Sequence, residues 1–276
     1  MNFTDKLLAA ARKNKSWLCI GLDPTPQSMP SVELLSFNKA IIENTADLVC
    51  AYKPNLAFYE ALGLDGLKAL EKTLEYLPKD IPVIGDAKRG DIGHTAEAYA
   101  RALFEVWGFD AATVNPYFGY DSLEPFFAYK EKGVFILCKT SNPGSGDFQD
   151  LLCQQSKSKA VPLWELVAIK TRGWNKEGNL GLVVGATFPE QLKRLRELCP
   201  DLPVLIPGIG TQGGDLELAV GYGSDKNREK AIISISRGII YASRGKDFAI
   251  AARNAAAQWR DKMNEIAASL SNQQNE

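Results

Sequence analysis

Short runs of apolar residues recur along the whole chain, and most are followed by a stretch in which apolar residues have helical spacing. Runs of about four to eight apolar residues that end at Gly, Pro or a charged residue are typical of buried strands. This pattern predicts strands over residues 17–23, 48–55, 81–88, 111–115, 133–140, 179–185, 203–210 and 231–238. Helical periodicity predicts helices over residues 1–16, 64–77, 95–107, 162–174, 188–199 and 246–270.

Continuous apolar strands that alternate with helices are typical of a parallel sheet covered by helices. About eight such units in 276 residues fit a single-domain (β/α)₈ TIM barrel of the α/β class better than an open doubly wound sheet. Residues 142–162 form an unusually long excursion after the fifth predicted strand, interpreted either as an active-site lid or wall or as an ordinary surface insertion. The C-terminal residues 271–276 are expected to be frayed.

Composition narrows the class of protein. The chain is 45% apolar and 24% charged, with a net charge of -1, which favours a globular domain over a nucleic-acid-binding surface. No apolar run approaches the roughly 20 residues that a membrane helix needs, and the N-terminal segment lacks a secretory apolar core. The cysteines are odd in number and form no CxxC pair, so we expect buried, reduced thiols in a cytoplasmic protein. They are Cys19, Cys50, Cys138, Cys153 and Cys199.

The segment GDAKRGDIGHTA, residues 85–96, carries the most chemistry in the sequence. Strand alternation places the Asp86 and Lys88 side chains on the same side, roughly 6–7 Å apart, and Asp91 in the loop that follows. Buried acids and a lysine at one strand end are costly unless the charges pair. We therefore interpret the segment as a catalytic array, with a solvated charge cluster as the alternative.

A second lysine stands at the end of another apolar strand, Lys53 in YKPN. Together with Asp86, Lys88 and Asp91 it gives an alternating series of positive and negative side chains at adjacent strand ends. Such an array can stay ionised inside a pocket because each charge is neutralised by its neighbours.

The two last predicted strands end in PGIGTQGGD and SRGIIYA. The glycines Gly208, Gly210 and Gly213 give a G-x-G-x-x-G pattern, which fits either a dinucleotide-binding turn or a phosphate site of a barrel. The dinucleotide reading lacks an acid at the end of the next strand, where the sequence has Arg237. Glycine amides and an arginine after strands seven and eight therefore favour a grip on a phosphate ester.

Metal and nucleophile chemistry have little support in the sequence. His94 is the only histidine and the cysteines are scattered, which argues against a zinc site and leaves His94 as the only possible base for a Ser-His-Asp triad. Residue types alone leave open a Mg²⁺ held by Asp86 and Asp91, although Lys53 and Lys88 already supply positive charge there.

With these features together, the chain resembles the orotidine 5′-phosphate decarboxylase family, in the branch that carries DAKRGDIG and KTSNPG. The resemblance extends from GLDP at residues 21–24 to SRGIIYA at 236–242. It implies a TIM barrel that converts orotidine 5′-phosphate to uridine 5′-phosphate, the last step of de novo pyrimidine synthesis, without a cofactor. It also implies a cytoplasmic homodimer that binds neither nucleic acid nor membrane.

The resemblance further implies roles for individual residues. The charged tetrad would be Lys53, Asp86, Lys88 and Asp91, with Lys88 as the proton donor. Asp91, Ile92 and Thr95 would complete the site of the other subunit. Asp23 would contact the ribose, Ser141 the pyrimidine amide, and Gln212 and Arg237 the phosphate. The remaining substrate-binding residues would be Pro207, Gly213 and Gly238.

Two other functions stay open on the sequence. One is a Mg²⁺-dependent aldolase or epimerase that acts on a sugar phosphate and shares the D-x-K-x-x-D barrel core. The other is a non-catalytic nucleotide-phosphate sensor, which loss of a tetrad residue would indicate; all four charges are present.

Overall fold

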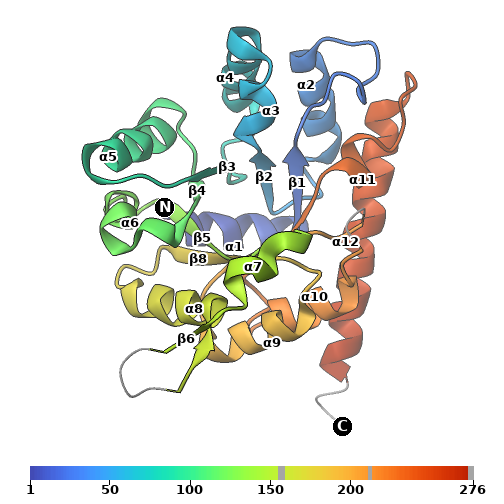
Figure 1. Cartoon of the computed structure of the whole chain (residues 1–276). Coiled ribbons are helices and arrows are strands. Elements are labelled where there is room, and N and C mark those ends of the chain that lie inside the picture. Colours follow the sequence, from blue (N-terminus) through green and yellow to red (C-terminus); the bar gives the residue numbers. More distant parts are fainter. Residues whose placement is uncertain (155–158, 211–212, 273–276) are drawn as a thin grey trace.

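The structure is a computed structural model, and it describes residues 1–154, 159–210 and 213–272. Eight strands form one parallel sheet in the order β2-β1-β10-β9-β8-β5-β4-β3 (Figure 1). They are β1 (Leu18–Leu22), β2 (Ala51–Pro54), β3 (Ile84–Arg89), β4 (Ala111–Val114), β5 (Gly133–Lys139), β8 (Leu180–Val184), β9 (Val204–Pro207) and β10 (Ala231–Ile235).

The two edge strands of this order meet and close the barrel. Parallel bridges join Tyr52 to Val83 and Asn55 to Asp86, and the Tyr52 amide donates to the Pro82 carbonyl oxygen over 3.0 Å. The predicted (β/α)₈ barrel is therefore confirmed, and each predicted strand corresponds to one strand of the barrel, although β3 extends one residue beyond its predicted end to Arg89.

Helices surround the barrel and follow its strands (Figure 1). The longer ones are α1 (Phe3–Asn14), α2 (Leu34–Thr45), α4 (Gly63–Tyr76), α5 (Gly93–Arg101), α6 (Tyr120–Phe127), α8 (Leu163–Trp174), α9 (Pro189–Leu198), α10 (Leu216–Gly223) and α12 (Phe248–Asn272). Short helical turns are α3 (Leu56–Glu60), η1 (Ala102–Val106), η2 (Pro116–Phe118), η3 (Pro143–Ser145), α7 (Gly146–Gln149) and α11 (Arg237–Ile240). The predicted helices are confirmed. The predicted helix over residues 95–107 corresponds to α5 followed directly by η1, and η1 alone is π-helical.

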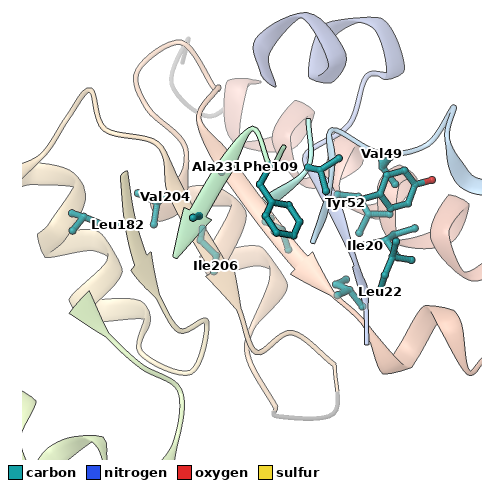
Figure 2. Packing of buried hydrophobic residues seen from close by; sticks show 14 of the residues in the cluster. Ile20, Leu22, Val49, Tyr52, Phe109, Leu182, Val204, Ile206 and Ala231 are labelled. Carbon is teal, nitrogen blue, oxygen red and sulfur yellow. The ribbon is translucent and has the colours of Figure 1, made fainter. Parts of the chain in front are cut away.

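Buried apolar residues form two layers. The outer layer lies between strands and helices, and Figure 2 shows members such as Ile20, Tyr52 and Ile206 on the strands. The inner layer fills the barrel, where Phe3 of α1 packs edge-on against Phe135 with ring centroids 5.6 Å apart. Helix α1 thus closes the amino-terminal end of the barrel, and Lys6 on the same helix contacts Asp110 over 2.8 Å.

The segment 142–162 is more ordered than the expected long loop. It contains η3, α7 and an antiparallel hairpin of β6 (Leu152–Cys153) and β7 (Val161–Pro162); residues 155–158 lie outside the described part of the chain. Asp150 in this segment accepts two 2.8 Å contacts from the buried Lys139 at the end of β5. Because a buried lysine needs a partner, this ion pair ties the segment to the barrel.

Two smaller expectations concern the tail and the cysteines. Helix α12 extends through residue 272, so the expected tail begins as helix, and residues 273–276 lie outside the described part. The thiols are free as predicted, but Cys153 is only half-buried because it lies in the surface hairpin rather than in the barrel. No helix among the described residues is long and apolar enough to span a bilayer.

Candidate active site

A cavity of about 760 Å³ opens at the carboxyl ends of the barrel strands. This volume falls in the range of about 300–1,000 Å³ that small-molecule sites occupy. The predicted site residues that line it are Asp23, Lys53, Asp86, Lys88, Ser141, Pro207, Arg237 and Gly238. The barrel therefore brings together side chains from segments spread over more than two hundred residues of sequence, at the face where TIM-barrel enzymes hold their substrates.

Three charged side chains form a continuous array in this cavity. Lys53 Nζ on β2 lies 2.9 Å from Asp86 Oδ2, and Lys88 Nζ lies 2.6 Å from Asp86 Oδ1. The Lys53 and Asp86 side chains are only 7% and 10% exposed, whereas that of Lys88 is 46% exposed. The array therefore has a buried ion pair at its base and a cation that reaches into the open cavity.

The pKa values in the buried pair follow from its charges. Burial acts to raise the pKa of Asp86, but attraction to Lys53 and Lys88 outweighs it and holds this pKa well below its ordinary value. Burial likewise acts to lower the pKa of Lys53, while Asp86 and Asp23 raise it above its ordinary value. Both groups thus stay ionised at neutral pH.

Strand β3 departs from regular geometry where it carries these charges. Its pairing with β4 shifts register between Gly85 and Arg89, and Lys88 has a φ of 49°, in the left-handed region. Asp86 and Lys88 share one cavity as predicted, but the regular alternation behind the expected spacing is interrupted. The bulge brings the two side chains into direct contact, because an extra residue re-aims the side chains of a bulged strand.

Three predicted site residues in and after the loop that follows β3 lie outside the cavity lining. Asp91, Ile92 and Thr95 do not line the cavity of their own chain. Ile92 is 58% exposed, and Tyr117 in η2 is 81% exposed. Exposed apolar side chains of this kind continue in Phe118 and Tyr120.

Backbone and side chains from β9 and β10 form another part of the cavity wall. Pro207 ends β9 and Gly208 follows it, and Arg237 and Gly238 follow the adjacent β10. Gly208 has a φ of 104°, which a residue with a side chain rarely adopts, so the glycine permits this turn. Gly213 also has a positive φ but does not line the cavity, and Gln212 lies outside the described residues.

Asp23 and Ser141 enter the cavity from β1 and β5. Asp23 Oδ1 accepts from the Asn55 amide over 3.2 Å, so this carboxylate is oriented by the end of β2. Ser141 passes close to Gly185, where an added Cβ would lie 2.7 Å from the Ser141 Cβ. Only glycine leaves room for the backbone after β5 to approach β8 this closely.

The sequence reasoning missed three residues that line or orient the cavity. The Thr113 hydroxyl on β4 contacts Asp86, Asn55 orients Asp23, and the Tyr241 hydroxyl donates to the Asp23 carbonyl oxygen over 3.0 Å. A threonine inside an apolar strand, next to the strand that carries Asp86, is a signal that could have identified Thr113. Asn55 and Tyr241 give no such signal, because their roles depend on neighbours that the fold supplies.

The residues considered for metal or triad chemistry are placed differently. Within the described part of the chain, no three His, Cys, Asp or Glu side chains are grouped so that they could hold a metal ion. Both carboxylate oxygens of Asp86 contact lysines, and Asp91 lies outside the cavity. His94 lies in α5, fully exposed and paired with Glu97, so it cannot activate a nucleophile in the cavity.

A family model described as orotidine 5′-phosphate decarboxylase / HUMPS matches residues 16–252. The chain belongs to this family. An orotidine 5′-phosphate decarboxylase of Dehalococcoides mccartyi is 54% identical over 265 residues, which cover 96% of this chain and 98% of the relative. The namesake of Roseiflexus sp. is 51% identical over 271 residues, with 96% and 98% covered.

A solved structure agrees with these relatives. The Leishmania donovani OMP decarboxylase superposes with a TM-score of 0.83 at 40% identity and covers 96% of this chain and 98% of its own. The resemblance to the orotidine 5′-phosphate decarboxylase family, drawn from the sequence motifs, is therefore confirmed for the family and the fold.

Proposed function

We propose that this chain decarboxylates orotidine 5′-phosphate to uridine 5′-phosphate, the last step of pyrimidine nucleotide synthesis, in the cytoplasm. The observation that carries the proposal is the Lys53–Asp86–Lys88 array inside the cavity. Family membership and the relatives named as decarboxylases support it. The proposed reaction calls for no added cofactor, because lysine side chains that line the cavity can neutralise the negative charge that develops.

The array supports a simple sequence of bond changes. The bond between C6 of the pyrimidine and its carboxylate breaks, CO₂ leaves, and the electron pair stays on C6. Lys88, the accessible cation, stabilises this carbanion and then gives it a proton from Nζ. Enzymes can lower barriers by as much as about 23 kcal/mol, and preorganised charge is usually the largest single contribution.

The other residues hold the substrate and the array. Asp86 lies next to the position proposed for the departing carboxylate, and Lys53 neutralises Asp86 from the buried side. Asp23 contacts the ribose and Ser141 the pyrimidine amide, while Arg237, Gly238, Pro207, Gly213 and Gln212 bind the phosphate end. Binding energy from the phosphate can orient the ring without touching the reacting bond.

We further propose that the active unit is a homodimer with two shared sites. Asp91, Ile92 and Thr95 do not line their own cavity, and the exposed apolar side chains of Ile92 and Tyr117 are of the kind that marks a protein interface. A twofold axis would place each of these loops over the partner's cavity, so that Asp91 completes the tetrad there.

The test is a direct assay of the purified protein. The absorbance of orotidine 5′-phosphate should fall with time, at an undiminished rate after exhaustive dialysis against EDTA. Inactivity with orotidine 5′-phosphate would overturn the proposal. An enzyme that chelation inactivates and Mg²⁺ restores would favour the sugar-phosphate aldolase or epimerase instead.

A further inference from the structure

Thr113 is a polar residue at the centre of an apolar strand. It lies on β4, is 1% exposed, and lines the cavity beside Asp86. Its hydroxyl donates to Asp86 Oδ1 over 3.0 Å and accepts from the Lys88 backbone amide over 2.9 Å. One hydroxyl therefore contacts both residues of the Lys88–Asp86 ion pair.

The bulge in β3 explains why a hydroxyl is needed here. Between Gly85 and Arg89 the regular ladder to β4 is interrupted, and it resumes where the Asn115 amide donates to the Arg89 carbonyl oxygen over 2.8 Å. The Lys88 amide lies in the interrupted part, where the Thr113 hydroxyl takes the place of a strand carbonyl. The contact also supports the left-handed conformation of Lys88, which a non-glycine residue keeps only when its surroundings hold it.

The direction of these two hydrogen bonds links them. The amide of Lys88 can only donate and the ionised carboxylate of Asp86 can only accept, so the hydroxyl must accept from one and donate to the other. Loss of the hydroxyl would leave the Lys88 amide without this acceptor and Asp86 Oδ1 with Lys88 Nζ alone. The backbone that carries the proton donor and the carboxylate that orients it would both lose a constraint.

We propose that Thr113 is a positioning residue for the decarboxylation: its hydroxyl fixes the Lys88 backbone and the Asp86 carboxylate in mutual register. This inference rests on the proposed function for its kinetic consequence. The side chain acts through Asp86 and Lys88, because its hydroxyl is already engaged with both.

The test replaces Thr113 by valine, which keeps the branched shape and removes the hydroxyl. The Thr113→Val protein should lose roughly 10- to 100-fold in kcat, because small misplacements of catalytic groups have effects of this order. Its dissociation constant for uridine 5′-phosphate should stay within about threefold of the wild-type value, since the phosphate end is untouched. Thr113→Ser, which retains the hydroxyl, should keep kcat within about threefold of wild type.

The matched control is Thr171→Val. Thr171 is fully buried on α8, and its hydroxyl has no hydrogen-bond partner among the described residues. This variant should keep wild-type kcat. If Thr113→Val fails to fold, Thr113→Ala and Thr113→Ser form a second pair that differs in the hydroxyl alone.

Outcomes that overturn the inference are distinct from those that overturn the proposed function. A Thr113→Val protein with kcat within twofold of an active wild type would refute the positioning role, as would a folded Thr113→Ser protein as impaired as Thr113→Val. A wild type without decarboxylase activity would refute the proposed function instead. Crystal structures then decide on Thr113 independently: Lys88 should keep its positive φ in Thr113→Ser and lose it in Thr113→Val, and an unchanged Lys88 in Thr113→Val would refute the role.

Discussion

The two ends of the barrel each contain a close lysine–aspartate contact, and the two contacts have different roles. At the amino-terminal end, Lys6 and Asp110 lie 2.8 Å apart, 18% and 23% exposed, and connect α1 to the barrel. Asp110 also accepts from the Val83 amide over 2.9 Å. At the carboxyl end, Lys53 and Asp86 lie 2.9 Å apart and are more deeply buried. One contact holds a helix, and the other forms the floor of a cavity.

The surroundings create this difference. Lys6 lies on α1, and Phe3 of the same helix packs against Phe135 at the amino-terminal end of the barrel. The Lys53–Asp86 pair has a second lysine, Lys88, beside it and lines a cavity of about 760 Å³. The same ion-pair chemistry therefore joins a helix to the barrel at one end, and at the other end it lies beside a second lysine that reaches into the cavity. Substitutions at the two ends should separate activity from stability.

The largest expected effect is at the carboxyl end of the barrel, where the cavity lies. Lys88→Ala should reduce turnover by at least about a thousandfold while uridine 5′-phosphate still binds, because loss of a proton donor acts on the transition state. The thermal midpoint should change little, since Lys53 still neutralises Asp86. Steady-state kinetics, ligand titration and calorimetry give the three readouts. A variant that kept a tenth of wild-type turnover would not fit the proton-donor role.

A second experiment asks whether one chain supplies every residue of the site at the carboxyl end of the barrel, as it does for the Lys6–Asp110 contact. Inactive Lys88→Ala and Asp91→Ala proteins are mixed in equal amounts and allowed to exchange subunits. Random mixing makes half of the dimers mixed, and each mixed dimer has one site with neither substitution. Activity should therefore return to about one quarter of wild type. A mixture that stays inactive, with exchange shown independently, would place Asp91 in its own subunit's site.

Arg237→Ala probes the phosphate end of the same cavity. Loss of a charge-assisted contact to a dianion should weaken kcat/KM for orotidine 5′-phosphate by about 100-fold, roughly 3 kcal/mol. Orotidine without its phosphate should be processed equally by both proteins. Equal losses for the two substrates would instead mean that Arg237 supports the fold.

The buried pair also predicts a pH dependence of stability. The pKa of Asp86 is lower in the folded chain than in the unfolded one, so its contribution is present above about pH 4 and is lost as pH falls toward the folded pKa. Relative to Asp86→Asn, the wild-type free energy of unfolding should fall by about 1.4 kcal/mol per pH unit below about pH 4. Urea titrations between about pH 3 and 6 measure it. A difference that stays constant over this range would contradict the depressed pKa.

The smallest effect is expected at the amino-terminal end of the barrel. Lys6→Met keeps the alkyl chain and removes the charge, so the free energy of unfolding should fall by about 1 kcal/mol, as for a partly exposed ion pair. The kcat should remain within about twofold of wild type. Denaturant unfolding and the decarboxylation assay check the two halves of this statement. A large loss of activity without loss of stability would show that the two ends are coupled.

Much of the architecture could be predicted because it depends on local pattern. Apolar runs located the strands, and the positions of Lys53, Asp86 and Lys88 at strand ends located the cavity. The contact between Lys88 and Asp86 could not be predicted in detail, because it depends on a bulge that only the pairing with β4 creates. Thr113 stands out as a polar residue in an apolar strand, but its role depends on partners from another strand.

In the segment 142–162, local sequence pattern predicts less regular structure than the fold contains. Its length outside the strand–helix alternation suggested a loop, but pairing between β6 and β7 and the ion pair from Lys139 to Asp150 give it structure. Both depend on contacts between residues apart in sequence, which periodicity does not reveal. The exposure of the apolar side chains of Ile92 and Tyr117 likewise depends on the fold rather than on local pattern.

The closure of the barrel has a consequence for its internal motions. Strands β2 and β3 meet through two isolated bridges, whereas β1 and β2 pair over four successive residues. The Lys53–Asp86 ion pair crosses this sparsely bonded junction, so side-chain charge contributes there what backbone hydrogen bonds supply elsewhere. Native-state deuterium exchange should be fastest, among the barrel strands, at the amides of this junction. The charges that we propose for the chemistry therefore also help to hold this junction of the barrel closed.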